Sequence, residues 1–167
     1  ARYRIGHLRR IMLALEPPAE GTSTNLAQPL DEVAERVRKR GMLVLLSDML
    51  APLDDLETKL SYFRARGHEV VLFQILDPAE LTLAFDEATL FHDIETGREV
   101  YVDPATARER YVARLNQHLD DVQASCDRLG IDAYRLTTDQ PIELALGNFL
   151  RSRLSTVAKT VKRSRGW

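Results

Sequence analysis

Two short, unbroken apolar runs stand in the middle of the chain. The first covers residues 42–47 and ends at Asp48, and the second covers residues 69–76 and ends at Asp77. Between them, apolar residues recur at helical spacing over residues 52–67. Unbroken runs of this length indicate strands that are buried on both faces, as in a parallel sheet. The pattern therefore predicts a βαβ unit at the centre of an α/β fold.

The remaining pattern extends this unit on both sides. A third core strand is expected over residues 131–137, although polar residues interrupt it. Helical spacing of apolar residues predicts helices over residues 5–15, 26–40 and 103–129, and from residue 141 onward. Residues 88–102 contain two short strand-like runs around Gly97, which is typical of a hairpin. Because this hairpin interrupts the β-α alternation, we expect it to be an insertion at the margin of the sheet.

Length and charge divide the chain into one domain and a tail. A chain of 167 residues suits a single domain, expected here over residues 1–150. Residues 151–167 carry six Arg and Lys residues and no acid, whereas the whole chain has a net charge of −2. We interpret this basic C-terminal tail as a solvated terminus. The alternative is a contact with phosphates or lipid headgroups.

Composition argues against several classes of function. A slightly negative net charge predicts no nucleic-acid partner, and no apolar stretch is long enough to span a bilayer. Cys126 is the single cysteine, so the chain can form no internal disulfide, which fits a cytoplasmic, reducing location. We expect Cys126 to fill the core, His118 to pack on its helix and His68 to be solvated. The chain begins at Ala1 within a helical pattern, which hints at a piece of something longer.

Candidate chemistry lies where the predicted strands end. Asp48, Asp77 and residues 137–138 follow the three core strands, and open α/β sheets place their ligands at this edge. The polar loop of residues 21–25 is expected near the same edge, so Thr24 and Asp48 could face one crevice. Oxygen ligands of this kind suit a hard cation such as Mg²⁺. The alternative is that these residues only cap helices and make turns.

Other chemistries find little support in the sequence. It contains no glycine-rich phosphate loop, no nucleophile elbow and no HExxH motif. The four histidines are scattered along the chain. We therefore predict no catalytic residues and no organic cofactor.

An ordered set of short segments resembles a known family. The segments are residues 21–26, 47–48, 66–70, 76–81, 93–97, 102–104, 130–131 and 138–141. Together they resemble the domain-of-unknown-function 58 family of bacterial proteins, which is related to von Willebrand factor A domains. The resemblance covers about residues 5–150, and the hairpin is part of it.

The resemblance implies a fold and a site. The fold would be a Rossmann-like, doubly wound, mostly parallel sheet flanked by helices, with a metal-ion-dependent adhesion site. Thr24 matches the threonine of that site and Asp48 matches its final aspartate. Its Asp-x-Ser-x-Ser segment has no match here and would lie before Ala1, together with the first strand. On this basis Mg²⁺ or Mn²⁺ would bind weakly or not at all, and the strand at 42–47 would present a free edge for self-association.

Three functions remain open from the sequence. The first is a non-enzymatic interaction or adaptor module that uses a metal near Thr24 and Asp48; the family resemblance implies a MoxR-type AAA+ ATPase as partner. The second is an enzyme, either a metal-dependent hydrolase or a receiver-like phosphoryl acceptor at Asp48. A receiver would need a lysine after its last strand, and residues 137–141 contain none. The third is a structural scaffold with an incomplete metal site.

Overall fold

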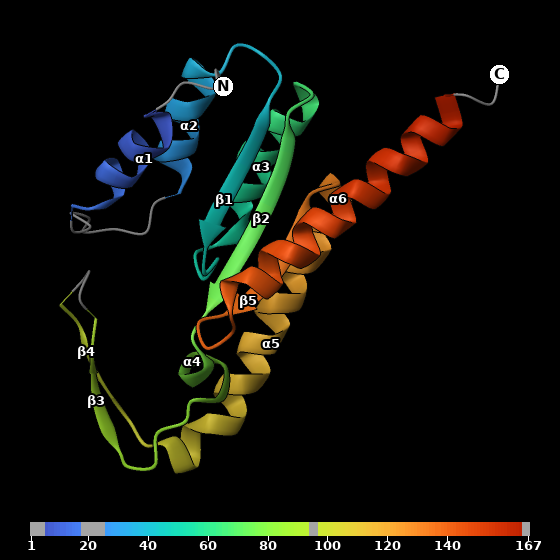
Figure 1. The fold of residues 1–167 in the computed structure, drawn as a ribbon. Coiled ribbons are helices and arrows are strands. Elements are labelled where there is room, and N and C mark those ends of the chain that lie inside the picture. Colours follow the sequence, from blue (N-terminus) through green and yellow to red (C-terminus); the bar gives the residue numbers. More distant parts are fainter. Residues whose placement is uncertain (1–5, 18–25, 94–96, 165–167) are drawn as a thin grey trace.

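The computed structural model describes residues 6–17, 26–93 and 97–164, with residues 155–164 described in backbone only. Helices and strands alternate along most of this chain (Figure 1). In chain order the elements are α1 (His7–Leu15), α2 (Ala27–Arg36), β1 (Met42–Ser47), α3 (Leu53–Ala65), β2 (Glu69–Leu76), α4 (Pro78–Thr82), β3 (Thr89–His92), β4 (Glu99–Val102), α5 (Pro104–Leu129), β5 (Asp132–Thr137) and α6 (Ile142–Ser164).

The main sheet contains three parallel strands in the order β1-β2-β5. Met42 pairs with Glu69 at the start of β1, and Val71 pairs with Asp132 at the start of β5. The βαβ unit, the third core strand and the α/β class predicted from the sequence are therefore confirmed. Strands β3 and β4 form a separate antiparallel hairpin, as the sequence predicted, which projects from the base of α5 in Figure 1.

Helices α2, α3 and α5 cover one face of the sheet. Leu56, Leu60 and Phe63 of α3 pack against Val70 and Leu72 of β2 in the largest core cluster. This cluster also contains Leu30 of α2 and Val122, Cys126 and Ile131 at the end of α5 and beyond it. Cys126 is 2% exposed, so its predicted place in the core is confirmed.

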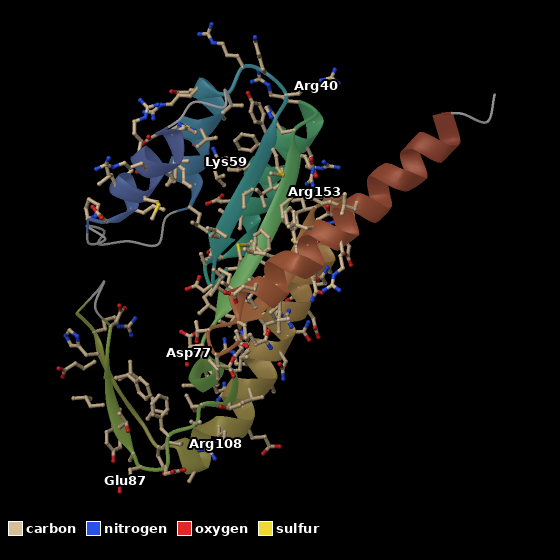
Figure 2. The ribbon with its side chains drawn as sticks, viewed as in Figure 1. Arg40, Lys59, Asp77, Glu87, Arg108 and Arg153 are labelled. Carbon is tan, nitrogen blue, oxygen red and sulfur yellow. The ribbon has the colours of Figure 1, made fainter. Side chains whose placement is uncertain are left out.

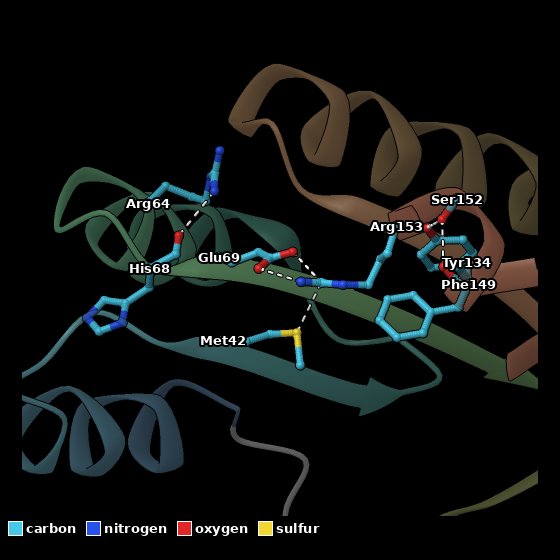
Figure 3. Close-up of polar contacts among 8 residues, drawn as sticks. All are labelled: Met42, Arg64, His68, Glu69, Tyr134, Phe149, Ser152 and Arg153. Atoms are coloured by element: carbon cyan, nitrogen blue, oxygen red, sulfur yellow. Dashed lines mark hydrogen bonds and ion pairs between the residues drawn. The ribbon is translucent and has the colours of Figure 1, made fainter. Parts of the chain in front are cut away.

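Helix α6 crosses the opposite face (Figure 1). Phe149 of α6 packs edge-on against Phe73 of β2 and Tyr134 of β5, with ring centroids 5.3 and 5.5 Å apart. Arg153, one turn further along α6, forms an ion pair with Glu69 and contacts the sulfur of Met42 (Figure 3). Helix α6 thus reaches across β2 to the amino end of β1.

One prediction about the sheet is wrong. The sequence predicted that strand 42–47 is buried on both faces, but its side chains alternate between half-buried and exposed. Met42, Val44 and Leu46 are 49%, 42% and 65% exposed. The physical reason is position: β1 is an edge strand among the described residues, and only its other face lies under the helices.

Two further predictions near the start of β1 are corrected. Helix α2 ends at Arg36 rather than Arg40, so Gly41 is not its C-cap. His68 is buried rather than solvated, with 4% of its side chain exposed. Its Nδ1 accepts a hydrogen bond from the Gly41 amide at 3.3 Å, and its ring packs edge-on against Phe63. The imidazole therefore joins the segment before β1 to α3.

The long helix α5 begins and ends as its sequence predicted. The Asp103 carboxylate accepts a hydrogen bond from the Ala105 amide at 3.0 Å, and Pro104 occupies the first helical turn. Gly130 ends the helix with φ of +65°, a conformation in which a side chain would be strained.

The two terminal helices depart from expectation in different ways. Helix α6 continues to Ser164, beyond the predicted end of the domain at residue 150, so the backbone of most of the basic tail is helical. Helix α1 forms where predicted, but it buries no residue: Leu8 and Leu15 are 70% and 77% exposed. Within the described ranges, no helix is both long and apolar enough to cross a membrane.

Candidate functional site

The carboxyl ends of the three parallel strands bring together the polar residues that the sequence singled out. Asp48 follows β1, Asp77 follows β2 and Thr138 follows β5. The Thr138 hydroxyl donates to Asp77 Oδ2 at 3.0 Å, and its amide donates to the Leu76 carbonyl at the same distance. The predicted convergence of Asp77 and Thr138 is therefore present at this edge of the sheet.

Asp77 serves as a helix cap. Its Oδ1 accepts a hydrogen bond from the Ala79 amide at 2.8 Å, and the Asp77 amide donates to Glu80 Oε2 at 3.1 Å. This reciprocal capping box fixes the start of α4, where Pro78 occupies the first turn. With Thr138 on Oδ2, both carboxylate oxygens of Asp77 are engaged (Figure 2 labels this residue beside α4). At this residue the helix-capping alternative from the sequence is confirmed.

Asp48 lies in a tight turn after β1. Its Oδ1 accepts hydrogen bonds from the Leu50 amide at 3.1 Å and the Ser47 hydroxyl at 3.4 Å. The Ser47 hydroxyl also accepts from the Met49 amide at 3.0 Å. Met49 has a φ of +60°, which is unfavourable for a residue with a side chain. Asp48 Oδ2 accepts no hydrogen bond within the described ranges, so one carboxylate oxygen is left for a ligand.

Side chains of neighbouring elements hold this turn in place through hydrogen bonds to its backbone carbonyl groups. Gln74, a buried polar residue of β2, donates from Nε2 to the Asp48 carbonyl at 3.0 Å. Arg135 of β5 donates to Gln74 Oε1 at 3.1 Å and to the Leu119 carbonyl at 3.1 Å. His118 Nε2 lies 2.6 Å from the Met49 carbonyl and must donate, since a carbonyl only accepts. Strand β2, strand β5 and helix α5 therefore fix the backbone beside Asp48.

Sequence reasoning found His118 as a packed residue but missed Gln74 and Arg135. Gln74 carried a signal, because it is a polar residue within the apolar run of β2, whereas Arg135 is one of the polar residues that interrupt the third strand. A buried polar side chain needs a hydrogen-bond partner, and here the two residues supply partners for each other and for a loop carbonyl.

The predicted metal ligands are placed only in part. Asp48 is half-buried at the edge of the sheet, and among the described residues only its Oδ1 accepts hydrogen bonds. Thr24 lies outside the described residues, so its distance from Asp48 is not defined. The described part of the chain contains no group of three His, Cys, Asp or Glu side chains that could hold a metal ion. The metal site at Thr24 and Asp48 stays a prediction.

A second surface with binding properties is the outer edge of β1. On one side β1 pairs with β2, and the other side meets no strand in the described ranges. Beside this edge, the exposed side chains of Met42, Val44 and Leu46 form a row on one face. We call these three residues and the adjoining strand edge the β1 edge. An apolar strand with an unpaired backbone edge is a template for another strand.

The class of this molecule is a mixed α/β domain with a small parallel sheet flanked by helices. Residues 2–121 match the model of a family described as "Protein of unknown function DUF58". The chain belongs to this family, as the resemblance in its sequence indicated.

Relatives of the chain occur in mycobacteria. An uncharacterized protein of Mycobacterium tuberculosis (strain H37Rv) is 32% identical over 148 residues, which cover 87% of this chain and 45% of that protein. An uncharacterized protein of Mycobacterium avium is 31% identical over 148 residues, which cover 87% of this chain and 85% of that protein. The chain therefore spans about half the length of the first relative. No solved structure matches it.

Proposed function

We propose that this chain is a non-enzymatic protein-interaction module of von Willebrand factor A type that binds its partner through the β1 edge. The observation that carries the proposal is the exposure of Met42, Val44 and Leu46 beside an unpaired strand edge. A row of exposed apolar side chains lowers solubility. Edge strands in soluble proteins usually carry charged residues or proline, or are covered by another element. β1 contains neither a proline nor a charged residue, so its own sequence does not oppose the addition of a strand.

The binding mode that fits this surface is the addition of a strand. An extended segment of the partner would form main-chain hydrogen bonds with β1 and enlarge the parallel sheet. Its side chains would cover Val44 and Leu46, which gives affinity through apolar burial. The segment would come from a second copy of this chain or from a MoxR-type AAA+ ATPase, the partner that the family resemblance implies.

Asp48 supports a metal-dependent form of the same proposal. It directly follows β1, and its Oδ2, which accepts no hydrogen bond from a described residue, would contribute to a Mg²⁺ or Mn²⁺ site together with Thr24 and a carboxylate of the partner. Hydrogen bonds to the carbonyls of Asp48 and Met49 hold the backbone beside this carboxylate in one place. A carboxylate on a fixed backbone binds a ligand better than one on a loose turn.

The decisive experiment replaces apolar residues of the β1 edge by lysine. Sedimentation velocity over a range of concentrations would measure self-association, and co-purification with a co-expressed MoxR-type ATPase would measure binding to that partner. We expect Val44→Lys/Leu46→Lys to weaken whichever association occurs at least tenfold, because charge at a strand edge opposes strand addition. Leu90→Lys is the matched control, since Leu90 is an exposed strand leucine of the hairpin.

A native chain that stays monomeric and binds no ATPase would contradict the edge proposal. Metal dependence has a separate test: titration with MnCl₂ by calorimetry, on the native chain and on Asp48→Ala. Heat that disappears in Asp48→Ala supports the metal-dependent form. Equal traces for both proteins would leave a scaffold whose edge binds without a metal.

A further inference from the structure

A groove runs along the amino-terminal half of α5, on the side that faces the turn after β1. It has a volume of about 630 Å³ and is lined by Leu50, Thr106, Arg110, Tyr111, Arg114 and His118, among others. We call it the α5 groove. It lies beyond the carboxyl end of the sheet, because Leu50 follows β1 and His118 bonds to the turn there. It is therefore separate from the apolar row of the β1 edge.

The two arginines that line the α5 groove, Arg110 and Arg114, are both positively charged. Arg110 and Arg114 are exposed, and neither forms an ion pair with another described residue. No residue that lines the groove is acidic. This is unusual in a chain whose net charge is −2 even with six basic residues in its last segment. Glu80 is the acidic residue of α4. Burial and the nearby charge of Glu80 raise the pKa of the Tyr111 hydroxyl. The Glu80 carboxylate accepts a hydrogen bond from the Asp77 amide.

A second groove in the same molecule is lined by charges of both signs. It lies between α2 and α3, has a volume of about 760 Å³, and its lining includes Asp31 and Glu35 beside Arg38, Lys59 and Arg66. Lys59 is bound to Asp31 at 2.5 and 2.7 Å, so one charge pair there forms within the chain (Figure 2 labels Lys59). No residue that lines the α5 groove is acidic, so the counter-charge for its two arginines would be that of a ligand.

The spacing of the arginines indicates the kind of anion. Arg110 and Arg114 are four residues apart, so they project from one helix face with Cβ atoms roughly 6 Å apart. Each guanidinium can take one carboxylate in a two-pronged bond. Phosphate sites in proteins commonly use backbone amides at a helix start. The groove reaches the first turn of α5 at Thr106, but the amides there already donate to the carbonyl and carboxylate of Asp103. Leu50 and Tyr111 add apolar contacts beside the charges.

We propose that the α5 groove binds an acidic peptide segment of a partner protein, with Arg110 and Arg114 each pairing with a carboxylate and Leu50 and Tyr111 contacting an apolar side chain between them. Tyr111, which also lines the groove, carries a hydroxyl that can donate a further hydrogen bond to the bound segment.

The test measures fluorescence anisotropy of a short labelled peptide in which glutamates alternate with leucine and serine. We expect saturable binding that weakens as NaCl is raised, since the contacts are charged and exposed. The Arg110→Gln/Arg114→Gln variant should bind at least tenfold more weakly. The matched control is Arg38→Gln/Lys39→Gln, which removes the same charge at the opposite end of the sheet and should bind like the native chain.

Three outcomes would overturn the proposal. The first is unchanged affinity in Arg110→Gln/Arg114→Gln, with circular dichroism showing a native fold. The second is equal binding of a peptide with glutamine in place of every glutamate, which would make the contact apolar. The third is tighter binding of a peptide with phosphoserine in place of the glutamates, which would reassign the groove to phosphate. The β1 edge is unchanged in all these proteins, so the two proposals fail independently.

Discussion

Strands β1 and β2 lie side by side in the same sheet, and both consist almost wholly of apolar residues. In β2, Val70, Val71, Leu72 and Phe73 are at most 5% exposed, because helices cover both faces. In β1, every second side chain is at least 42% exposed. The comparison teaches that position in the sheet decides what an apolar strand does. β2 stabilises the fold, whereas the exposed face of β1 adds little stability.

Alanine in place of one leucine in each of these strands should give the largest difference in the free energy of unfolding. Leu72→Ala should lower the free energy of unfolding by about 2–5 kcal/mol, because it leaves a cavity in the core. Leu46→Ala, at a position 65% exposed, should change it by less than about 0.5 kcal/mol. Urea denaturation monitored by circular dichroism measures both. Similar losses in the two variants would break the distinction between β1 and β2.

The reactivity of the Cys126 thiol reports on burial at the covered face of the sheet. Burial, with Asp127 and Glu57 nearby, raises the pKa of its thiol from 9.0 to about 11. Thiolate is the reactive form, so the native chain at pH 8 should react with iodoacetamide about a hundredfold more slowly than the unfolded chain. Between pH 9 and 11 the folded thiol keeps its proton while the unfolded one loses it, so the free energy of unfolding should fall as pH rises. Equal alkylation rates before and after unfolding would contradict this account.

Gln74 is the polar residue of β2, and its replacement should cost less than a core cavity. Gln74→Leu keeps the volume but takes the side-chain donor away from the Asp48 carbonyl. It also removes one acceptor of Arg135, which keeps its hydrogen bond to the Leu119 carbonyl. We expect a loss of about 1–3 kcal/mol in urea denaturation. Amide hydrogen exchange should also speed up at residues 48–50, since their turn loses an anchor. Unchanged exchange there would show that His118 alone holds the turn.

The smallest expected effect concerns the link between α6 and the amino ends of β1 and β2. Glu69→Gln removes the charge that Arg153 binds, but both side chains are partly exposed (Figure 3). We expect a loss of at most about 1 kcal/mol, which should shrink further in high salt. A much larger loss, insensitive to salt, would mean that this ion pair rather than Phe149 holds α6 on the sheet.

Local patterns predicted the elements well because each carries its own physical signal. Apolar runs located β2, the capping residues Asp103 and Gly130 bounded α5, and Gly97 marked the hairpin turn. The burial of β1 was not predictable in the same way. An apolar run shows that a strand prefers burial, but the neighbours that would cover it are set by tertiary structure.

The candidate site was predictable to a lesser degree. The strand ends placed Asp48, Asp77 and Thr138 at one edge of the sheet, since parallel strands end together. The anchors of the Asp48 turn were not found, because Gln74, His118 and Arg135 come from distant parts of the sequence. The two arginines of the α5 groove likewise look like any charged helix face until the fold shows which acids are near them.

The sheet order also has a consequence for how the chain acquires its structure during synthesis on the ribosome. β2 meets β1 early, but its other neighbour β5 follows only after the hairpin and the whole of α5 have been made. Until then, the β2 face bearing Val71 and Phe73 has no cover, and Phe149 of α6 is made only after β5. The nascent chain therefore carries a bare apolar face while residues 77–148 are added, a state in which chaperone binding and premature aggregation compete.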